Sequence, residues 1–108
     1  MNAEAVAPGA SLPAIITEIS PDMISIQSKR AVLPNARISL SFKLKDKVKL
    51  RGKVAWVLDL YSADGYHFFQ AGIKTESIIH SNIKAVGIAE KSRLLQEILY
   101  QMMDKSIN

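Results

Sequence analysis

Hydrophobic and polar residues alternate one by one through the middle of the chain. Between residues 38 and 56 most even positions are apolar, among them Leu40, Phe42 and Trp56, while every odd position from 43 to 53 is Lys or Arg. A period of two is typical of a half-buried β-strand. The run is too long, and too charged in its middle, for one strand. The pattern therefore predicts a β-hairpin with one apolar and one cationic face.

The register of this hairpin follows from keeping its apolar residues on one face. A connecting loop of three or five residues does so, whereas a two-residue loop at Asp46-Lys47 mixes the faces. We favour a three-residue loop over residues 45–47. It gives the cross-strand pairs Leu44–Val48, Phe42–Leu50, Lys43–Lys49 and Ser41–Arg51.

Further short strands are predicted on both sides of this hairpin. Residues 12–19 and 23–28 are rich in isoleucine, and residues 66–75 are rich in aromatic and β-branched side chains. Turn signals separate them at Pro21-Asp22, Pro34-Asn35 and Asp64-Gly65. Five or six short strands in succession indicate a mainly β fold, a small antiparallel β-barrel over residues 12–80. The Ala-rich residues 1–11 are expected to form a flexible N-terminus.

The hydrophobic period changes to that of a helix in the last part of the chain, residues 81–108. An apolar stripe recurs at spacings of three and four, formed by Leu95, Ile98, Leu99 and Met102. This predicts an amphipathic helix that is firm over residues 89–103 and could begin near Asn82. We expect the stripe to cover an open side of the barrel, with a dimer or partner interface as the alternative.

The positive charge of the chain is concentrated in the predicted hairpin. The 108 residues carry a formal net charge of +4, and residues 43–53 alone hold six cations and one acid. A solvated outer face is the ordinary explanation of such alternation. The alternative is a patch for an anionic partner, with Lys43, Lys49, Arg51 and Lys53 as candidates. There is no cysteine and no apolar stretch long enough to cross a membrane, so we expect a cytoplasmic protein.

Ordered motifs give the chain a resemblance to the PilZ domain, a bacterial barrel best known as a receptor for cyclic di-GMP. The resemblance covers residues 15–78. It rests on residues 16–24 (ITEISPDMI), 32–40 (VLPNARISL), 52–57 (GKVAWV) and 71–75 (AGIKT). The first stands where the family has its Asp/Asn-x-Ser-x-x-Gly motif, and the last two resemble its Val-x-Trp and Gly-Val-x-Phe strands. The resemblance implies a PilZ-like barrel with a C-terminal helix and a role in motility or biofilm regulation.

The chain departs from the family at the residues that grip the nucleotide. The family has an Arg-x-x-x-Arg motif before the first strand, but residues 1–19 contain no Arg or Lys. In the second motif Ser20 is kept, while Glu18 and Met23 replace the Asp/Asn and the glycine. A side chain at a position of close backbone approach crowds a ligand. These departures argue against cyclic di-GMP binding in the usual family mode.

Three functions remain in the order in which we favour them. The first is a non-enzymatic adaptor that acts through a protein partner, as a monomer or a homodimer. The second is a cyclic di-GMP receptor with the substitute cations Lys29, Arg30 and Arg37. The third, weak nucleic-acid binding by the hairpin, is disfavoured because Trp56 and Phe42 have the opposite parity to the cations.

Catalysis lacks the residue patterns that it requires. His67 and His80 have no further ligand at metal-binding spacing, and no glycine-rich phosphate loop is present. We therefore expect a binding protein without enzymatic activity, metal or cofactor.

Overall fold

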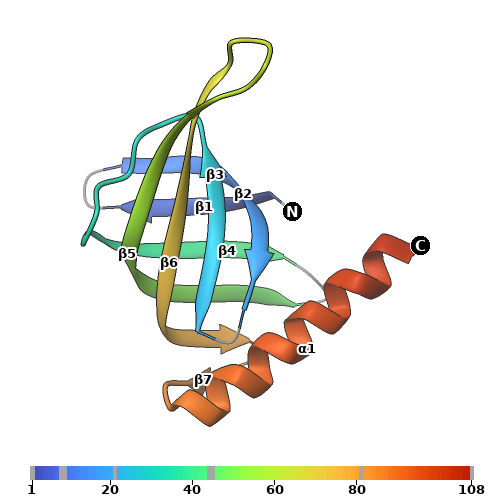
Figure 1. The fold of residues 1–108 in the computed structure, drawn as a ribbon. Helices are drawn as coiled ribbons and strands as arrows, with labels where there is room; N and C mark the ends of the chain where they lie inside the picture. The colour runs from blue at the N-terminus through green and yellow to red at the C-terminus, as the bar shows by residue number, and fades with distance from the viewer. Residues whose placement is uncertain (1, 8–9, 21, 44–45, 81, 108) are drawn as a thin grey trace.

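The computed structural model describes residues 2–7, 10–20, 22–43, 46–80 and 82–107, with the side chains of residues 10 and 102–107 left out. Over these residues, strands make up most of the chain and one helix ends it (Figure 1). The elements are β1 (Asn2–Ala7), β2 (Ala10–Ile19), β3 (Met23–Ser28), β4 (Arg37–Lys43), β5 (Lys47–Tyr61), β6 (His67–His80), β7 (Ile83–Ala85) and α1 (Ile88–Ile107).

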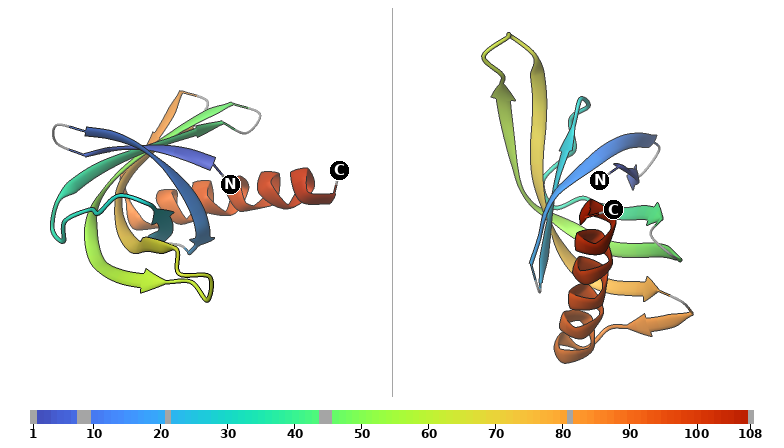
Figure 2. Two further views of the ribbon diagram at one scale, coloured as in Figure 1. Left: turned by 90° about the horizontal axis from the view of Figure 1, so that it is seen from above. Right: turned by 90° about the vertical axis from the view of Figure 1, so that its right-hand side faces the viewer.

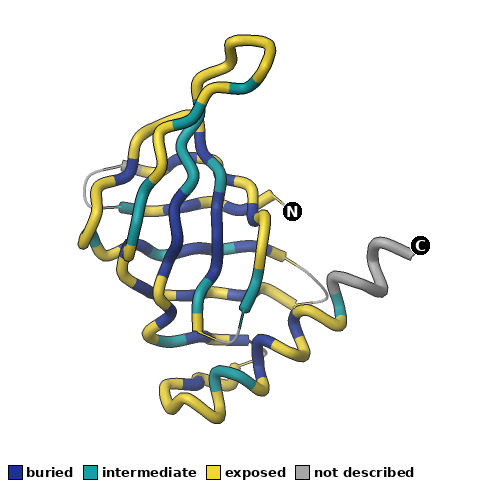
Figure 3. Tube along the Cα trace, viewed as in Figure 1, coloured by how far each residue is buried: buried dark blue, intermediate teal, exposed yellow. Residues whose placement is uncertain are grey.

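Six of the strands close into an antiparallel barrel. Neighbours follow the order β3-β2-β1-β4-β5-β6, and β6 pairs with β3 to complete the circle, while β7 extends the sheet beyond β6. Buried and exposed positions alternate along the strands, most regularly along β4 and the first half of β5 (Figure 3). Ile24, Leu40, Leu50 and Ile73 are fully buried in the interior. The predicted mainly β fold, a small barrel followed by a helix, is confirmed.

The N-terminal segment, expected to be flexible, is part of the barrel instead. β1 pairs with β2 along its whole length and with β4 on its other edge. Its side chains alternate as in the other strands, and Ala3 and Ala5 point into the core. Alanine is a weak strand former, so the period of two in this segment carries little signal when the neighbouring strands are unknown. The barrel therefore begins at residue 2 and not at residue 12.

The β4–β5 hairpin has the predicted parity but a register shifted by two residues. Phe42 pairs with Val48 and Lys43 with Lys47, where we expected Leu50 and Lys49 as their partners. A register shift of two residues keeps every apolar side chain on the same face of the hairpin. The pattern of hydrophobic residues therefore cannot distinguish the two registers. Residues 44 and 45, which include the predicted partner of Val48, lie outside the described residues.

The C-terminal region begins with a strand before the helix starts. His80 pairs with Ile83 across a turn in which Asn82 has a φ of 65°. The helix begins at Ile88, six residues after the earliest predicted start. Asparagine tolerates the left-handed conformation that such a turn requires. The segment 81–108 is therefore a short hairpin arm followed by a helix.

The helix packs on the lower end of the barrel, as Figures 1 and 2 show. Leu95 and Ile98 are buried as predicted, whereas Leu99 is 40% exposed and the side chain of Met102 lies outside the description. Leu94, which the predicted stripe omitted, is buried as well. The Lys91 ammonium donates a 2.7 Å hydrogen bond to the carbonyl oxygen of Thr75 on β6. The expected packing on the barrel is thus seen for the first half of the helix.

Candidate functional site: a cationic outer face

The cations of the central hairpin gather on the outside of three adjacent strands. We call this surface the cationic face; it consists of Arg37 and Lys43 on β4, Lys47, Lys49, Arg51 and Lys53 on β5, and Lys74 on β6. All seven residues are exposed, while their sequence neighbours on β5 point into the core. The four residues predicted as an anionic-partner patch therefore lie together. Lys47 and Lys74 belong to the face but were not in the predicted patch. Lys47 was expected in the loop, and no sequence signal placed Lys74 beside β5.

Cations face one another across the strands of this face. Lys43 lies opposite Lys47, Arg37 lies opposite Lys53, and Lys53 in turn lies opposite Lys74. Cross-strand pairs change stability by roughly 0.2–1 kcal/mol, and like-charged pairs do so unfavourably.

Acidic residues lie beside this face, with Asp46 just before β5, Glu76 on β6 and Glu4 on β1. The Arg37 guanidinium lies 3.7 Å from the Glu76 carboxylate, and both side chains are largely exposed, so this ion pair is weak. Glu4, on the neighbouring β1, accepts a hydrogen bond from the Ser11 hydroxyl. The face is therefore a concentrated positive charge that the fold maintains at some cost in stability.

A β-bulge brings Trp56 onto the same outer face. Val54 pairs with Ile73 and Trp56 with Gly72, so Ala55 is the extra residue of the bulge. Ile73 is buried, and Gly72 therefore faces outward together with its partner Trp56. The half-buried indole lies over Gly72, so closely that a Cβ on the glycine would collide with it. We predicted that Trp56 lies on the face opposite to the cations, and this was wrong because the bulge reverses the alternation. Phe42 is buried as predicted.

The motif residues Glu18, Ser20 and Met23 lie at the turn between β2 and β3. Glu18 is exposed, whereas Ser20 and Met23 are half-buried. The Ser20 hydroxyl donates to the carbonyl oxygen of Met23 at 3.0 Å, and the Ser20 amide donates to the same oxygen at 2.8 Å. The turn is also joined to β6, because the Thr75 amide donates to the Asp22 carbonyl. Ser20 thus serves to close a turn.

The proposed substitute cations do not gather around this turn. Met23 begins β3, and Lys29 and Arg30 follow its other end. At about 3.3 Å per residue the two ends lie roughly 20 Å apart. The cations beside Met23 are instead those of the cationic face, since Met23 pairs with Lys74 in the row that continues through Lys53 to Arg37. Lys29 and Arg30 therefore lie away from the motif turn, and their role as substitute cations stays a prediction, whereas Arg37 lies in the row of Met23.

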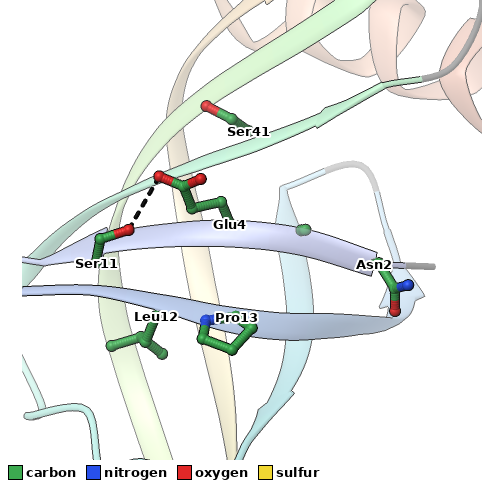
Figure 4. Close-up of a pocket in the computed structure, with 7 residues that line it drawn as sticks. Asn2, Glu4, Ser11, Leu12, Pro13 and Ser41 are labelled. Atoms are coloured by element: carbon green, nitrogen blue, oxygen red, sulfur yellow. Dashed lines mark hydrogen bonds between the residues drawn. The ribbon is translucent and has the colours of Figure 1, made fainter.

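A shallow hollow beside the cationic face lacks cations of its own. It encloses about 400 Å³ between β1, β2 and β4 and is lined by Asn2, Ala3, Glu4, Ser11, Leu12, Pro13 and Ser41 (Figure 4). The Ser11 hydroxyl donates to Glu4 Oε1 at 2.9 Å. A second hollow lies along α1 at Arg93, Glu97 and Tyr100. No residue of the cationic face lines either hollow. Neither hollow is therefore part of this face.

Neither histidine belongs to a metal site among the described residues. The described residues contain no group of three or more His, Asp or Glu side chains that could hold a metal ion. His67 Nε2 pairs with an Asp59 carboxylate oxygen on an exposed part of the β5–β6 hairpin. His80 is buried in the barrel, and its Nε2 has no hydrogen-bond partner among the described residues. The helix that the structure describes is not long and apolar enough to cross a membrane.

Comparisons of the chain with protein-family models, with curated proteins and with solved structures found no match.

Proposed function

We propose that this protein is a non-enzymatic, PilZ-like adaptor whose cationic face docks on an acidic surface of a partner protein. The observation that carries the proposal is the arrangement of seven exposed cations over β4, β5 and β6, three pairs of which face each other across strands. An anionic partner converts this repulsion into attraction and speeds the encounter between the two molecules.

The shape of the face favours a macromolecule over a small ligand. Small-molecule sites are typically concave and bury most of the ligand. Neither hollow described above includes a residue of the cationic face. The cations also extend along β5 from Lys47 to Lys53, which is roughly 20 Å at the rise of a strand. A surface of this length matches the dimensions of a protein contact better than those of one nucleotide.

A cyclic di-GMP receptor is the second candidate, and one cluster favours it. Lys53 and Lys74 face each other beside Met23, and the Trp56 indole lies next to them on the same outer surface. Cations can pair with phosphates, and an indole can stack on a base. The same combination would also serve single-stranded nucleic acid, which is the third candidate.

A peptide titration with charge-reversed variants tests the adaptor proposal. The probe is a fluorescently labelled oligoglutamate peptide, followed by anisotropy, with an oligoglutamine peptide of the same length as the neutral control. One variant carries Lys49→Glu, Arg51→Glu and Lys53→Glu. The matched control carries Lys29→Glu, Arg30→Glu and Lys84→Glu, which are exposed cations outside the face. Three reversals lower the formal net charge by six in both, from +4 to −2.

We expect the wild type to bind oligoglutamate in a salt-sensitive manner and the face variant to lose that binding. The control variant should keep most of the affinity, because the cationic face is intact. Equal losses in both variants would show that net charge alone attracts the peptide, and the proposal would be wrong. Parallel titrations with cyclic di-GMP and an oligothymidine strand distinguish the other two candidates.

A further inference from the structure

The β5–β6 hairpin continues beyond the barrel as a two-stranded ribbon, which is visible at the top of Figure 1. On one side β6 pairs with β3 as far as Phe69, whose partner is Ser28. On the other side the neighbours of β5 end at Val54, which exchanges backbone hydrogen bonds with residues 35 and 36. We call residues 58–69 the projecting ribbon. Its two strands pair with each other. From Phe69 toward the tip of the ribbon, they pair with no other described strand.

The projecting ribbon carries apolar side chains on both of its faces. Tyr61 lies opposite His67, and Asp59 opposite Phe69, on one face; Leu60 lies opposite Phe68 on the other. A two-stranded ribbon has no third layer with which to bury such residues. Leu58 is 49% exposed, and Tyr61 and Tyr66 are about 70% exposed. The ribbon therefore presents an apolar surface to solvent.

Side chains on one face of the ribbon contact each other. The Tyr61 and His67 rings stack with centroids 4.6 Å apart and an interplanar angle of 12°. His67 also packs against Phe69 and pairs with the Asp59 carboxylate. A surface that is ordered before binding loses less conformational entropy when a partner docks. These contacts order the ribbon from one side. The opposite face, with Leu58, Leu60 and Phe68, is the one left for a partner.

The charges of the ribbon and of its base are complementary. Residues 58–69 contain no Lys or Arg, so the positive charges that usually protect exposed strands from pairing are missing. Its acids are Asp59, which is paired with His67, and Asp64 at the tip. The base carries Lys29 and Arg30, directly after the residue that pairs with Phe69. The Arg30 amide donates to the Ser28 hydroxyl at 3.1 Å, which holds the backbone at Arg30 close to the end of β3.

We infer that the projecting ribbon is a self-association surface that binds the ribbon of a second copy of this chain in a two-fold symmetric, antiparallel arrangement. The faces with Leu58, Leu60 and Phe68 pack against each other. The tip of each ribbon then lies at the base of the other, which brings Asp64 next to Lys29 and Arg30 of the second copy. Within one copy Asp64 precedes Phe69, at the base, by five residues, which is roughly 17 Å at the rise of a strand and too far for a direct ion pair. The tip and the base of each copy thus contact the base and the tip of the other, as in an isologous dimer.

The test is sedimentation equilibrium of the full chain from low-micromolar to millimolar concentration. The contact is small, so we expect a concentration-dependent dimer of the transient class. Leu58→Lys should weaken the dimer at least about ten-fold, because each interface loses two leucines and gains two repelling charges. The matched control is Leu99→Lys, which changes a leucine of similar exposure, 40%, on α1. It should leave the dimer unchanged.

A charge exchange tests the antiparallel orientation separately. Asp64→Lys should weaken the dimer, and adding Arg30→Asp should recover part of the loss, because an ion pair of opposite sign is re-formed between the copies beside the unchanged Lys29. Both positions are exposed, so the variants are expected to fold, which circular dichroism checks. A wild type that stays monomeric at millimolar concentration overturns the inference. A dimer that survives Leu58→Lys but is lost in Leu99→Lys also overturns it and assigns the contact to the helix.

Discussion

The contact between Trp56 and Gly72 predicts a specific, measurable cost for Gly72→Ala. A Cβ at Gly72 would lie 2.8 Å from Cζ2 of the Trp56 indole and closer still to Cε2 and Nε1. Carbon atoms pack best at roughly 3.5–4.0 Å, so the ring must withdraw by well over half an ångström. Overpacking of this kind typically costs about 1–3 kcal/mol. Because the indole is half-buried at the surface, it can move outward, and we expect a loss of about 1–2 kcal/mol.

Urea unfolding followed by circular dichroism measures this loss, and fluorescence locates it. Trp56 is the single tryptophan of the chain, so a shift of the emission spectrum in the folded Gly72→Ala protein reports directly on the displaced ring. In a Trp56→Ala background the same substitution should cost less than about 0.5 kcal/mol, since the colliding ring is gone. Gly87→Ala is the matched control, because its Cβ meets nothing closer than 3.5 Å. Equal stability and emission for Gly72→Ala and the wild type would refute the outward placement of Trp56.

Three further predictions concern the barrel and its helix. Ala5→Asp should cost more than about 3 kcal/mol or prevent folding, because it puts an unpaired carboxylate at a fully buried site; an unchanged urea midpoint would mean that β1 is not part of the barrel. Ile98→Ala should lower the free energy of unfolding by about 2–5 kcal/mol, whereas Tyr100→Ala, at an exposed site, should stay within about 0.5 kcal/mol; similar values for both would contradict the packing of α1. Lys91→Met keeps the aliphatic stem and removes the hydrogen bond to Thr75, so the unfolding free energy should fall by about 1 kcal/mol at an unchanged denaturant slope.

Local patterns predicted those elements in which hydrophobic side chains alternate strongly. Residues 23–28 were predicted as a strand and form β3 with the same bounds, and the alternation from Ile38 to Val54 placed the cations outside. The helix followed from the three- and four-residue spacing of Leu95, Ile98 and Leu99. In each case large apolar side chains report which face is buried.

The features that sequence reasoning missed depend on contacts between distant segments. β1 is a strand because β2 and β4 lie on either side of it, and its alanines carry little signal by themselves. The position of Trp56 depends on one extra residue, Ala55, and a bulge of one residue reverses the parity of everything beyond it. The row from Met23 through Lys74 and Lys53 likewise requires the β3–β6 closure, which no local pattern encodes.

The cationic face and the projecting ribbon occupy different parts of β5. The cations extend from Lys47 to Lys53, and the ribbon begins at Leu58, with the bulge at Ala55 between them. The two surfaces can therefore be altered separately by substitution.

The measurement that tests the central claim most directly is a calorimetric titration of the purified protein with cyclic di-GMP at moderate salt. The adaptor proposal predicts no saturable heat, because Ser20 is engaged in closing its turn and because, in the proposed resemblance to PilZ domains, Met23 stands where those domains have a glycine. Saturable binding that is lost in Lys74→Glu would contradict it and would make the protein a nucleotide receptor with a rebuilt site.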